Sequence, residues 1–235
     1  MHLSGSRPGG VSPNMAHYLG ELYRLGGHRQ YVSPSALAAE LDVSPPAVAR
    51  MGGRLSERGL VDRKRYRGVR LTGRGEREAL REIRYHRMSE AFLVNVLKYG
   101  WHEAHEMADA LAEIADEGLI SRMEQAAGHP TRCPHGEPIP AADGSIAELH
   151  DFPLTELQVG DRGMISRVRI RETQRLEYLA REGLFPQTRF RVEGKGPFGG
   201  PVRIGLERGE VVLGAEIAGQ IYIEADPEDP GNQPG

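Results

Sequence analysis

Imidazole and carboxylate side chains recur at four-residue intervals in two neighbouring stretches of this sequence. His86 and Glu90 form the first pair, and His105, Asp109 and Glu113 form the second series. Residues four apart lie on the same face of an α-helix, so each series would gather its nitrogen and oxygen donors on one side. Donors of this kind that converge from two helices are typical of a site for a transition-metal ion.

The same spacing also suits ordinary ion pairs, and a His–Glu pair at i,i+4 stabilises a helix by only a few tenths of a kcal/mol. The presence of His105 on a second helix is what favours a metal site. The segment His102-Glu-Ala-His105 is not a zinc-protease motif, because its histidines are three residues apart instead of four.

Cys133 and His135 lie in a segment rich in proline and glycine, and no second Cys/His pair accompanies them. We therefore interpret this segment as a rigid linker and not as a metal knuckle. Cys133 is the only cysteine, which excludes an intramolecular disulfide and fits a reducing cytoplasm.

The charge is unevenly distributed along the 235 residues. Residues 1–75 contain 12 Lys/Arg and 5 Asp/Glu, whereas residues 76–127 contain 6 and 11. A basic amino-terminal third is typical of phosphate contact, and an acidic middle suits a cation site. No apolar run approaches the roughly 18 residues of a membrane span, and the first residues lack a signal-peptide pattern. We expect a soluble cytoplasmic protein that has no membrane partner.

Capping residues and apolar periodicity divide the basic third into three helices and a hairpin. Ser33 and Ser44 each precede a proline at a predicted first helical position, as N-cap residues do. Two helices joined by a short turn and followed by a hairpin have the proportions of a winged helix-turn-helix. The predicted helices span Asn14–Leu25, Pro34–Leu41 and Pro45–Arg58, and the predicted strands span Leu60–Lys64 and Val69–Thr72.

The third helix and the wing supply candidate DNA contacts. Small residues at the start of the helix permit a close approach to base edges, and Arg50 is long enough to reach a guanine or a phosphate. A basic hairpin is often only solvated surface, but the four cations of residues 63–67 fall where a wing is expected. The candidates are Ser33, Ser44, Pro46, Ala47, Arg50, Arg54, Lys64, Arg65 and Arg67.

The remainder of the chain changes from helical to strand-like patterns. Thr72 is predicted to cap a long helix that ends near Tyr99, and a second helix is predicted over His102–Ala126. After the linker, short β-like runs with one helix, Thr173–Arg181, indicate a small barrel. The predicted parts are a disordered start (1–11), a winged helix domain (12–75), a helical domain (76–127), a linker (128–150), a barrel (151–226) and a disordered tail (227–235).

The chain resembles the diphtheria toxin repressor family, the iron- or manganese-dependent transcriptional regulators. The resemblance covers roughly residues 14–225. It rests on His17-Tyr-Leu, Ser-Pro-Pro-Ala-Val-Ala-Arg50-Met, Leu-Thr-Gly-Arg-Gly75, Tyr-His-Arg87 and, most specifically, Cys-Pro-His-Gly-Glu-Pro-Ile-Pro140. It implies a mainly α protein with small β parts: a winged helix-turn-helix domain, a helical dimerisation domain with two metal sites, and a carboxy-terminal SH3-like β-barrel of the FeoA type.

The resemblance also implies ligands for both metal sites. His86, Glu90 and His105 match the helical ligands of the ancillary site, and Glu172 matches its usual carboxylate from the barrel. The family often has a second ligand from the barrel, an amide side chain, and Arg175 stands at that position here. The neighbouring amide Gln174 could take its place as a ligand.

The primary, regulatory site departs from the family pattern. Its ligands here would be His17, Asp109 and Glu113, with Ala112 where a carboxylate is usual. A neighbouring Glu106 or Glu21, or water, would complete the shell, and a degenerate, unoccupied site is the competing interpretation. Since no sulfur ligand stands at a matched position, we expect Mn²⁺, with Fe²⁺ as the alternative.

These observations predict a metal-dependent DNA-binding transcriptional regulator, a repressor of metal-uptake genes in manganese or iron homeostasis. A metal-activated homodimer would bind double-stranded DNA at a palindromic operator, because two-fold symmetry places two recognition helices at successive half-sites. The alternative is a winged-helix regulator whose metal sites are structural or lost and which another ligand controls. An enzyme is not expected, since no nucleophile or general base is evident beside an open metal position.

Overall fold

The computed structural model describes residues 11–225, which form two compact units. The first unit contains residues 11–89, 108–128 and 139–146, and the second contains residues 90–107, 129–138 and 147–225. The predicted disordered segments, 1–11 and 227–235, lie outside the described residues except for Val11, which is buried.

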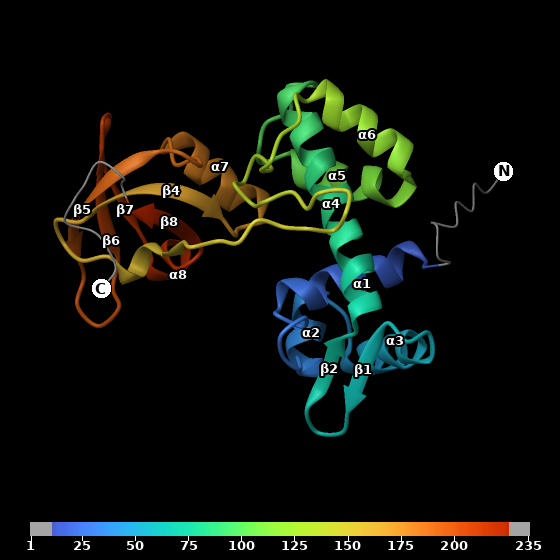
Figure 1. Cartoon of the computed structure of the whole chain (residues 1–235). Coiled ribbons are helices and arrows are strands. Elements are labelled where there is room, and N and C mark those ends of the chain that lie inside the picture. Colours follow the sequence, from blue (N-terminus) through green and yellow to red (C-terminus); the bar gives the residue numbers. More distant parts are fainter. Residues whose placement is uncertain (1–10, 226–235) are drawn as a thin grey trace. The chain divides into compact units, whose positions relative to one another are not determined.

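The amino-terminal part of the first unit is a winged helix-turn-helix, as predicted (Figure 1). Its elements agree with the predicted boundaries to within about one residue. They are α1 (Pro13–Arg24), α2 (Pro34–Glu40), α3 (Pro45–Glu57), β1 (Val61–Lys64) and β2 (Gly68–Leu71). Leu19 and Leu22 of α1, Leu37 of α2 and Leu55 of α3 are fully buried in one apolar core. The three helices therefore hold the wing on a common support.

The wing begins its second strand at a position that only glycine can occupy. Gly68 has φ +107°, and a Cβ built there would lie 2.0 Å from the carbonyl oxygen of Val32. This close approach permits the bridge between Val32 and Val69, whose backbone groups exchange two hydrogen bonds. The segment that precedes α2 is thereby joined to the wing.

Side-chain caps explain where two of the helices begin. The Ser33 hydroxyl accepts a hydrogen bond from the Ala36 backbone N–H at 3.1 Å, and the Thr72 hydroxyl accepts one from Gly75 at the same distance. Ser44 stands at the N-cap of α3, as predicted, but its side chain makes no cap hydrogen bond. Pro46 has no N–H to offer, and the Ala47 N–H donates to the Ser44 backbone carbonyl at 2.9 Å.

The helical stretch after the wing contains α4 (Gly73–Asn95), α5 (Ala104–Ile114) and α6 (Glu117–Ala126). The single helix predicted over His102–Ala126 was wrong, because it is divided into α5 and α6. Asp116 causes the division: its backbone is extended, and its carboxylate accepts a hydrogen bond from the Leu119 N–H at 2.8 Å as the N-cap of α6.

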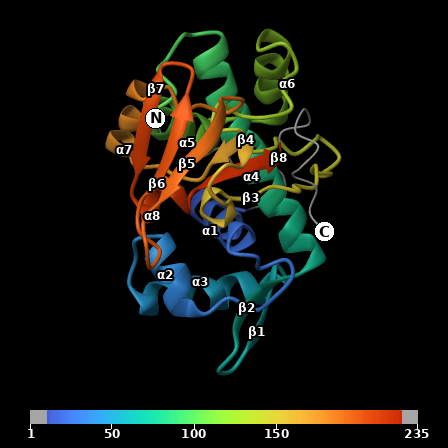
Figure 2. The same cartoon turned by 90° about the vertical axis from the view of Figure 1, so that its left-hand side faces the viewer.

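The carboxy-terminal part of the second unit is an antiparallel sheet of six strands in the order β3-β8-β4-β5-β6-β7 (Figures 1 and 2). Its strands are β3 (Phe152–Pro153), β4 (Arg162–Val168), β5 (Arg189–Lys195), β6 (Val202–Leu206), β7 (Gly209–Leu213) and β8 (Ile221–Ala225), and its helices are η1 (Leu154–Glu156), α7 (Thr173–Arg181) and α8 (Ala215–Ala218). The predicted SH3-like part is present, but the closed barrel was wrong. Among the described residues no pairing joins β3 to β7, and β3 is only two residues long.

The proline-rich segment is folded against this sheet as a tight loop, Arg132–Pro138, whose two ends form a β-bridge. The Val168 N–H of β4 donates to the His135 carbonyl at 2.9 Å. Gly136 has φ +86°, and a Cβ there would lie 2.1 Å from the Ser166 carbonyl oxygen. The loop backbone therefore lies directly on β4.

Arg167 of β4 clamps the same loop through its side chain. Its guanidinium donates to both carboxylate oxygens of Asp151, at 2.7 and 2.9 Å, and to Glu137 of the loop at 2.8 Å. Burial acts to raise the pKa of Asp151, but hydrogen bonds from Arg167 and Ser166 more than offset it and lower that pKa. Asp151 therefore remains a carboxylate that holds the clamp.

No helix within residues 11–225 is both long and apolar enough to cross a membrane. The apolar residues of the second unit are instead gathered in a core of the sheet and α7, with Leu176, Leu179, Ile204 and Ile221 fully buried.

The two serine N-caps give a matched test of this description. Ser33→Ala should lower the free energy of unfolding by about 1 kcal/mol, because it removes an N-cap hydrogen bond. Ser44→Ala should leave stability unchanged, since its hydroxyl makes no such bond. Urea denaturation of the full chain measures both variants, and a greater loss for Ser44→Ala would contradict the capping assignment.

Candidate metal centre and nucleic-acid interface

A buried carboxylate lies at the centre of the candidate metal site. Glu90, near the end of α4, is only 3% exposed. One of its oxygens, Oε1, lies 3.0 Å from Nδ1 of His105 and 3.3 Å from Nδ1 of His135. His105 belongs to α5, and His135 belongs to the loop that is docked on β4. Glu90 therefore joins three separate segments of the second unit.

The hydrogen bond from His135 to a backbone carbonyl determines which of its ring nitrogens carries the hydrogen. Its Nε2 lies 3.0 Å from the carbonyl oxygen of Trp101, which can only accept, so Nε2 carries the hydrogen and donates. In the neutral ring, Nδ1 then presents a lone pair to the Glu90 carboxylate. Two acceptors 3.3 Å apart repel each other unless a cation or a proton lies between them. The hydrogen bond from Nε2 to the Trp101 carbonyl is the type of contact that orients a metal-binding histidine.

Cys133 adds a sulfur donor to the same cluster. Its Sγ lies 4.0 Å from Nδ1 of His135, and one ligand atom from each of Glu90, Cys133 and His135 lies within 4.8 Å of the others. All three residues are buried. The interpretation of Cys133 and His135 as linker residues without a metal-binding role omitted this proximity, which arises only when the loop folds onto β4.

His86 has a carboxylate neighbour on α5 within the first unit. Its Nδ1 lies 2.8 Å from the carboxylate of Asp109 on α5, within the first unit. His86 is buried, whereas about half of the Asp109 side chain is exposed. The family resemblance implies that these two residues belong to separate sites. His86 precedes Glu90 by one turn of α4, so the two residues occupy the same helix face.

The other predicted ligands are exposed. His17, Glu106, Glu113 and Glu172 are all on the surface, and Glu172 lies 3.8 Å from the guanidinium of Arg175. Among residues 11–225, none of them belongs to a group of three closely spaced donor atoms. Glu21 is buried and forms an ion pair with Arg24. The primary site remains a prediction from the sequence.

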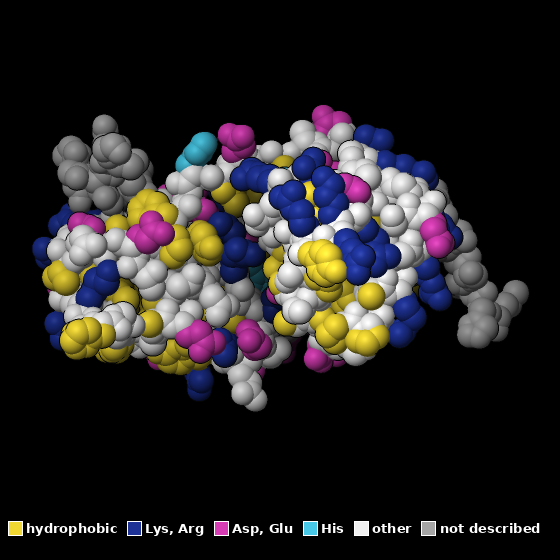
Figure 3. Space-filling model, turned by 90° about the horizontal axis from the view of Figure 1, so that it is seen from below, with side chains coloured by type: hydrophobic (Ala, Val, Ile, Leu, Met, Phe, Trp, Pro, Cys, Tyr) yellow, Lys and Arg dark blue, Asp and Glu magenta, His cyan; other side chains and the backbone are white. Residues whose placement is uncertain are grey.

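The candidate DNA-binding residues lie on one accessible part of the winged helix. Ser33, Ser44, Pro46, Arg50 and Arg54 are exposed, and Ala47 is half-buried. On the opposite side of α3, Val48 and Leu55 are buried in the core. Figure 3 looks onto this part of the molecule and shows Lys and Arg side chains gathered over it. The surface therefore has the charge that a nucleic acid attracts.

Aromatic rings organise the cations of the wing. The Tyr31 ring contacts two of them, with Lys64 Nζ at 5.0 Å and the Arg67 guanidinium at 5.2 Å from its centroid. At the tip of the wing, the Arg65 guanidinium lies 4.8 Å from the centroid of the exposed Tyr66 ring. Cation–π contacts of this kind hold long side chains in position while the charge stays accessible.

Comparison with known families divides the chain in three. Residues 11–69 match the iron dependent repressor N-terminal DNA binding domain. Residues 72–141 match the iron dependent repressor metal binding and dimerisation domain, and residues 152–225 match the FeoA domain. The described winged helix and the open sheet correspond to the first and last of these.

Individual relatives agree with this division. The chain is 28% identical to the iron-dependent repressor IdeR of Mycobacterium tuberculosis (strain ATCC 25618 / H37Rv), over 88% of this chain and 95% of that protein. A solved manganese-dependent transcriptional repressor in complex with manganese is 33% identical, with a TM-score of 0.83 over 90% of this chain and all of the other. The structure of ScaR with bound Zn²⁺ is 32% identical, with a TM-score of 0.78 over 91% of this chain and all of the other. The chain therefore belongs to the diphtheria toxin repressor family of iron- and manganese-dependent transcriptional regulators.

Proposed function

We propose that this protein is a manganese-responsive repressor of metal-uptake genes, which binds a palindromic operator as a homodimer. The observation that carries the proposal is the buried Glu90 carboxylate, which faces two imidazoles and a thiol in a chain that also has a DNA-binding domain. The match of residues 72–141 to a metal binding and dimerisation domain supports the homodimer.

Glu90, His105, Cys133 and His135 are the proposed ligands in the second unit. Their carboxylate, imidazole and thiol groups are all ligands that divalent first-row metals accept. When bound, the cation supplies positive charge that neutralises Glu90 and cross-links the segments that carry the donors. His86, one turn before Glu90, and its partner Asp109 provide a further imidazole and carboxylate along α4 and α5.

The choice of manganese rests on the relatives more than on the donor set. No sulfur ligand was predicted from the sequence, but Cys133 lies in the cluster. A thiolate suits softer metals, and Zn²⁺ binds most nitrogen and oxygen sites more tightly than Mn²⁺ does. The similar proteins include a repressor solved with manganese and the manganese regulator SloR, but also ScaR with bound Zn²⁺. Several metals must therefore be compared.

Helix α4 is the element that would carry the effect of the cation toward the DNA-binding domain. Thr72, which caps α4, also donates to the Gly59 carbonyl at 2.8 Å, and Arg74 donates to the Arg58 carbonyl at 3.3 Å. The start of α4 is thus fastened to the connection between α3 and β1. Cation binding at Glu90, near the other end of α4, would favour one arrangement of the chain. The cation can shift the equilibrium between the favoured arrangement and the alternative only by the difference in its affinity for the two.

A second candidate is a winged-helix regulator whose metal ions are structural and which another ligand controls. The exposed positions of His17 and Glu113 favour it, because the predicted primary site then lacks a preformed set of donors. In that case a metal would stabilise the fold but leave operator affinity unchanged.

Substitution of Glu90 tests the proposed function directly. Fluorescence anisotropy of operator DNA, in chelator and then with Mn²⁺, anaerobic Fe²⁺ or Zn²⁺, should show binding that is tightened about tenfold or more, roughly 1.4 kcal/mol of coupling. Glu90→Gln should abolish the tightening while metal-free binding is retained, because the amide keeps the shape but not the charge. Glu207→Gln is the control, since it removes an exposed carboxylate from the β6–β7 connection. Equal metal dependence in the Glu90→Gln and Glu207→Gln variants would refute the role of Glu90.

Arg50 on α3 is the residue that we expect to read a base. Arg50→Ala should reduce the free-energy difference between operator binding and random-duplex binding by about 1–3 kcal/mol, the usual effect of losing a bidentate guanine contact. Competition binding at fixed ionic strength measures this difference. An equal loss on both duplexes would instead assign Arg50 to the phosphate backbone.

A further inference from the structure

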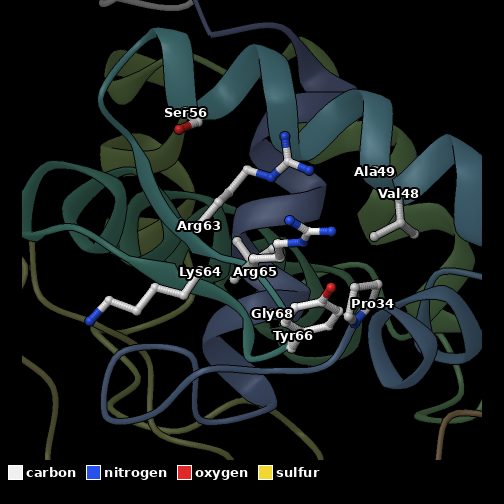
Figure 4. A pocket seen from close by; sticks show the side chains of 10 residues that line it. Pro34, Val48, Ala49, Ser56, Arg63, Lys64, Arg65, Tyr66 and Gly68 are labelled. Carbon is white, nitrogen blue, oxygen red and sulfur yellow. The ribbon is translucent and has the colours of Figure 1, made fainter.

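A cleft of about 500 Å³ separates the recognition helix α3 from the wing within the first unit (Figure 4). Helix α3 contributes Val48, Ala49 and Ser56 to its lining, and β1 and the wing tip contribute Arg63, Lys64, Arg65 and Tyr66. Pro34, Gly68 and Val69 complete it.

The cleft contains positive charge without a matching negative charge. Three of its ten lining residues are cations and none is a carboxylate. Arg63 belongs to β1 and Arg65 to the turn that follows it, and Figure 4 shows both side chains extending toward α3. The Lys64 ammonium points away from α3 and lies over Tyr31 instead. Two guanidiniums therefore share a space that an anion would stabilise.

Two glycines in the recognition helix leave room for Arg63. A Cβ added at Gly53 would lie 3.5 Å from Nη1 of Arg63. A Cβ added at Gly52 would lie 3.8 Å from Nε of Arg63 and 3.2 Å from the Tyr18 hydroxyl. Adjacent glycines cost a helix about 1 kcal/mol each relative to alanine. Their presence in the middle of α3 is explained if the guanidinium must lie against the helix backbone.

We propose that this cleft is a seat for a phosphate of the DNA backbone, in which Arg63 and Arg65 donate to the phosphate oxygens. The planar guanidinium matches phosphate geometry with two parallel N–H groups. Gly52 and Gly53 act as positioning residues, because larger side chains there would push Arg63 out of the cleft. This inference rests on the proposed DNA-binding function. It assigns a phosphate contact to Arg63, which lies on the opposite face of the strand from Lys64.

The salt dependence of binding tests the seat. Each lost phosphate contact lowers the slope of log affinity against log salt by about 0.9. Arg63→Gln should lower this slope by the same amount on operator and random duplexes, since phosphate contacts carry no sequence information. Arg70→Gln is the control: it removes the same charge from β2 beside Asp62, on the Lys64 face of the wing, and should leave the slope unchanged. An unchanged slope for Arg63→Gln, or an equal change for Arg70→Gln, would overturn the proposal.

Substitution of Gly53 tests the positioning role separately. Gly53→Ala should raise the melting temperature and keep DNA affinity, because a methyl group fits at 3.5 Å from the guanidinium. Gly53→Met, which is also a good helix former, should weaken binding as much as Arg63→Gln does. The Gly53→Met/Arg63→Gln double variant should bind no more weakly than either single variant. Additive losses in the double variant, with folding confirmed by circular dichroism, would contradict the positioning role.

The outcomes separate this inference from the proposed function. If the wild-type protein binds both duplexes without any metal effect, the metal-gated repressor fails, and the slope changes still test the seat. Inorganic phosphate, titrated at constant ionic strength, should compete with DNA for the wild type but not for Arg63→Gln. Binding of inorganic phosphate at the cleft together with an unchanged DNA slope for Arg63→Gln would identify a free-anion site and overturn the DNA assignment.

Discussion

The burial of the Glu90 charge is the constraint on which the candidate metal centre depends. A carboxylate that is 3% exposed must be compensated by a cation or by hydrogen bonds, because an unpaired buried charge costs several kcal/mol. Its neighbours are imidazoles from α5 and from the loop on β4. The Arg167 clamp and the Trp101 carbonyl hold that loop and orient His135. We propose that a divalent cation completes this site.

The DNA-binding side of the molecule depends on a different device, which is the placement of fixed cations on a small apolar core. Tyr31 holds Lys64 and Arg67 on one face of the wing, whereas Arg63 reaches the recognition helix on the other. The Tyr18 hydroxyl is buried beneath Gly52, and burial raises its pKa to about 12 although the nearby charge of Arg63 acts to lower it. The wing and α3 thus both present cations over a packed interior, with the cleft between them.

Local signals predicted much of this fold. The N-cap residues Ser33 and Thr72 correctly predicted the starts of α2 and α4. The predicted helix Thr173–Arg181 has the same bounds as α7. The predictions failed in two ways: the local N-cap signal of Asp116 was missed, and contacts between residues far apart in the sequence decided the form of the sheet and the docking of the loop on β4. Asp116 looked like one more polar residue on a helix, and the alternating strand pattern could not tell an open sheet from a barrel. Cys133 and His135 approach Glu90 only because Gly136 lets their loop lie on β4, which the sequence does not show.

The central claim is that cation binding and operator binding are coupled, and reciprocity tests it most directly. Calorimetry would measure the affinity of the full chain for Mn²⁺ with and without saturating operator DNA at constant ionic strength. Linkage requires the operator to tighten Mn²⁺ binding by the same factor by which Mn²⁺ tightens operator binding. We expect a factor of about ten or more in both directions. An affinity for Mn²⁺ that is identical with and without operator would contradict the account.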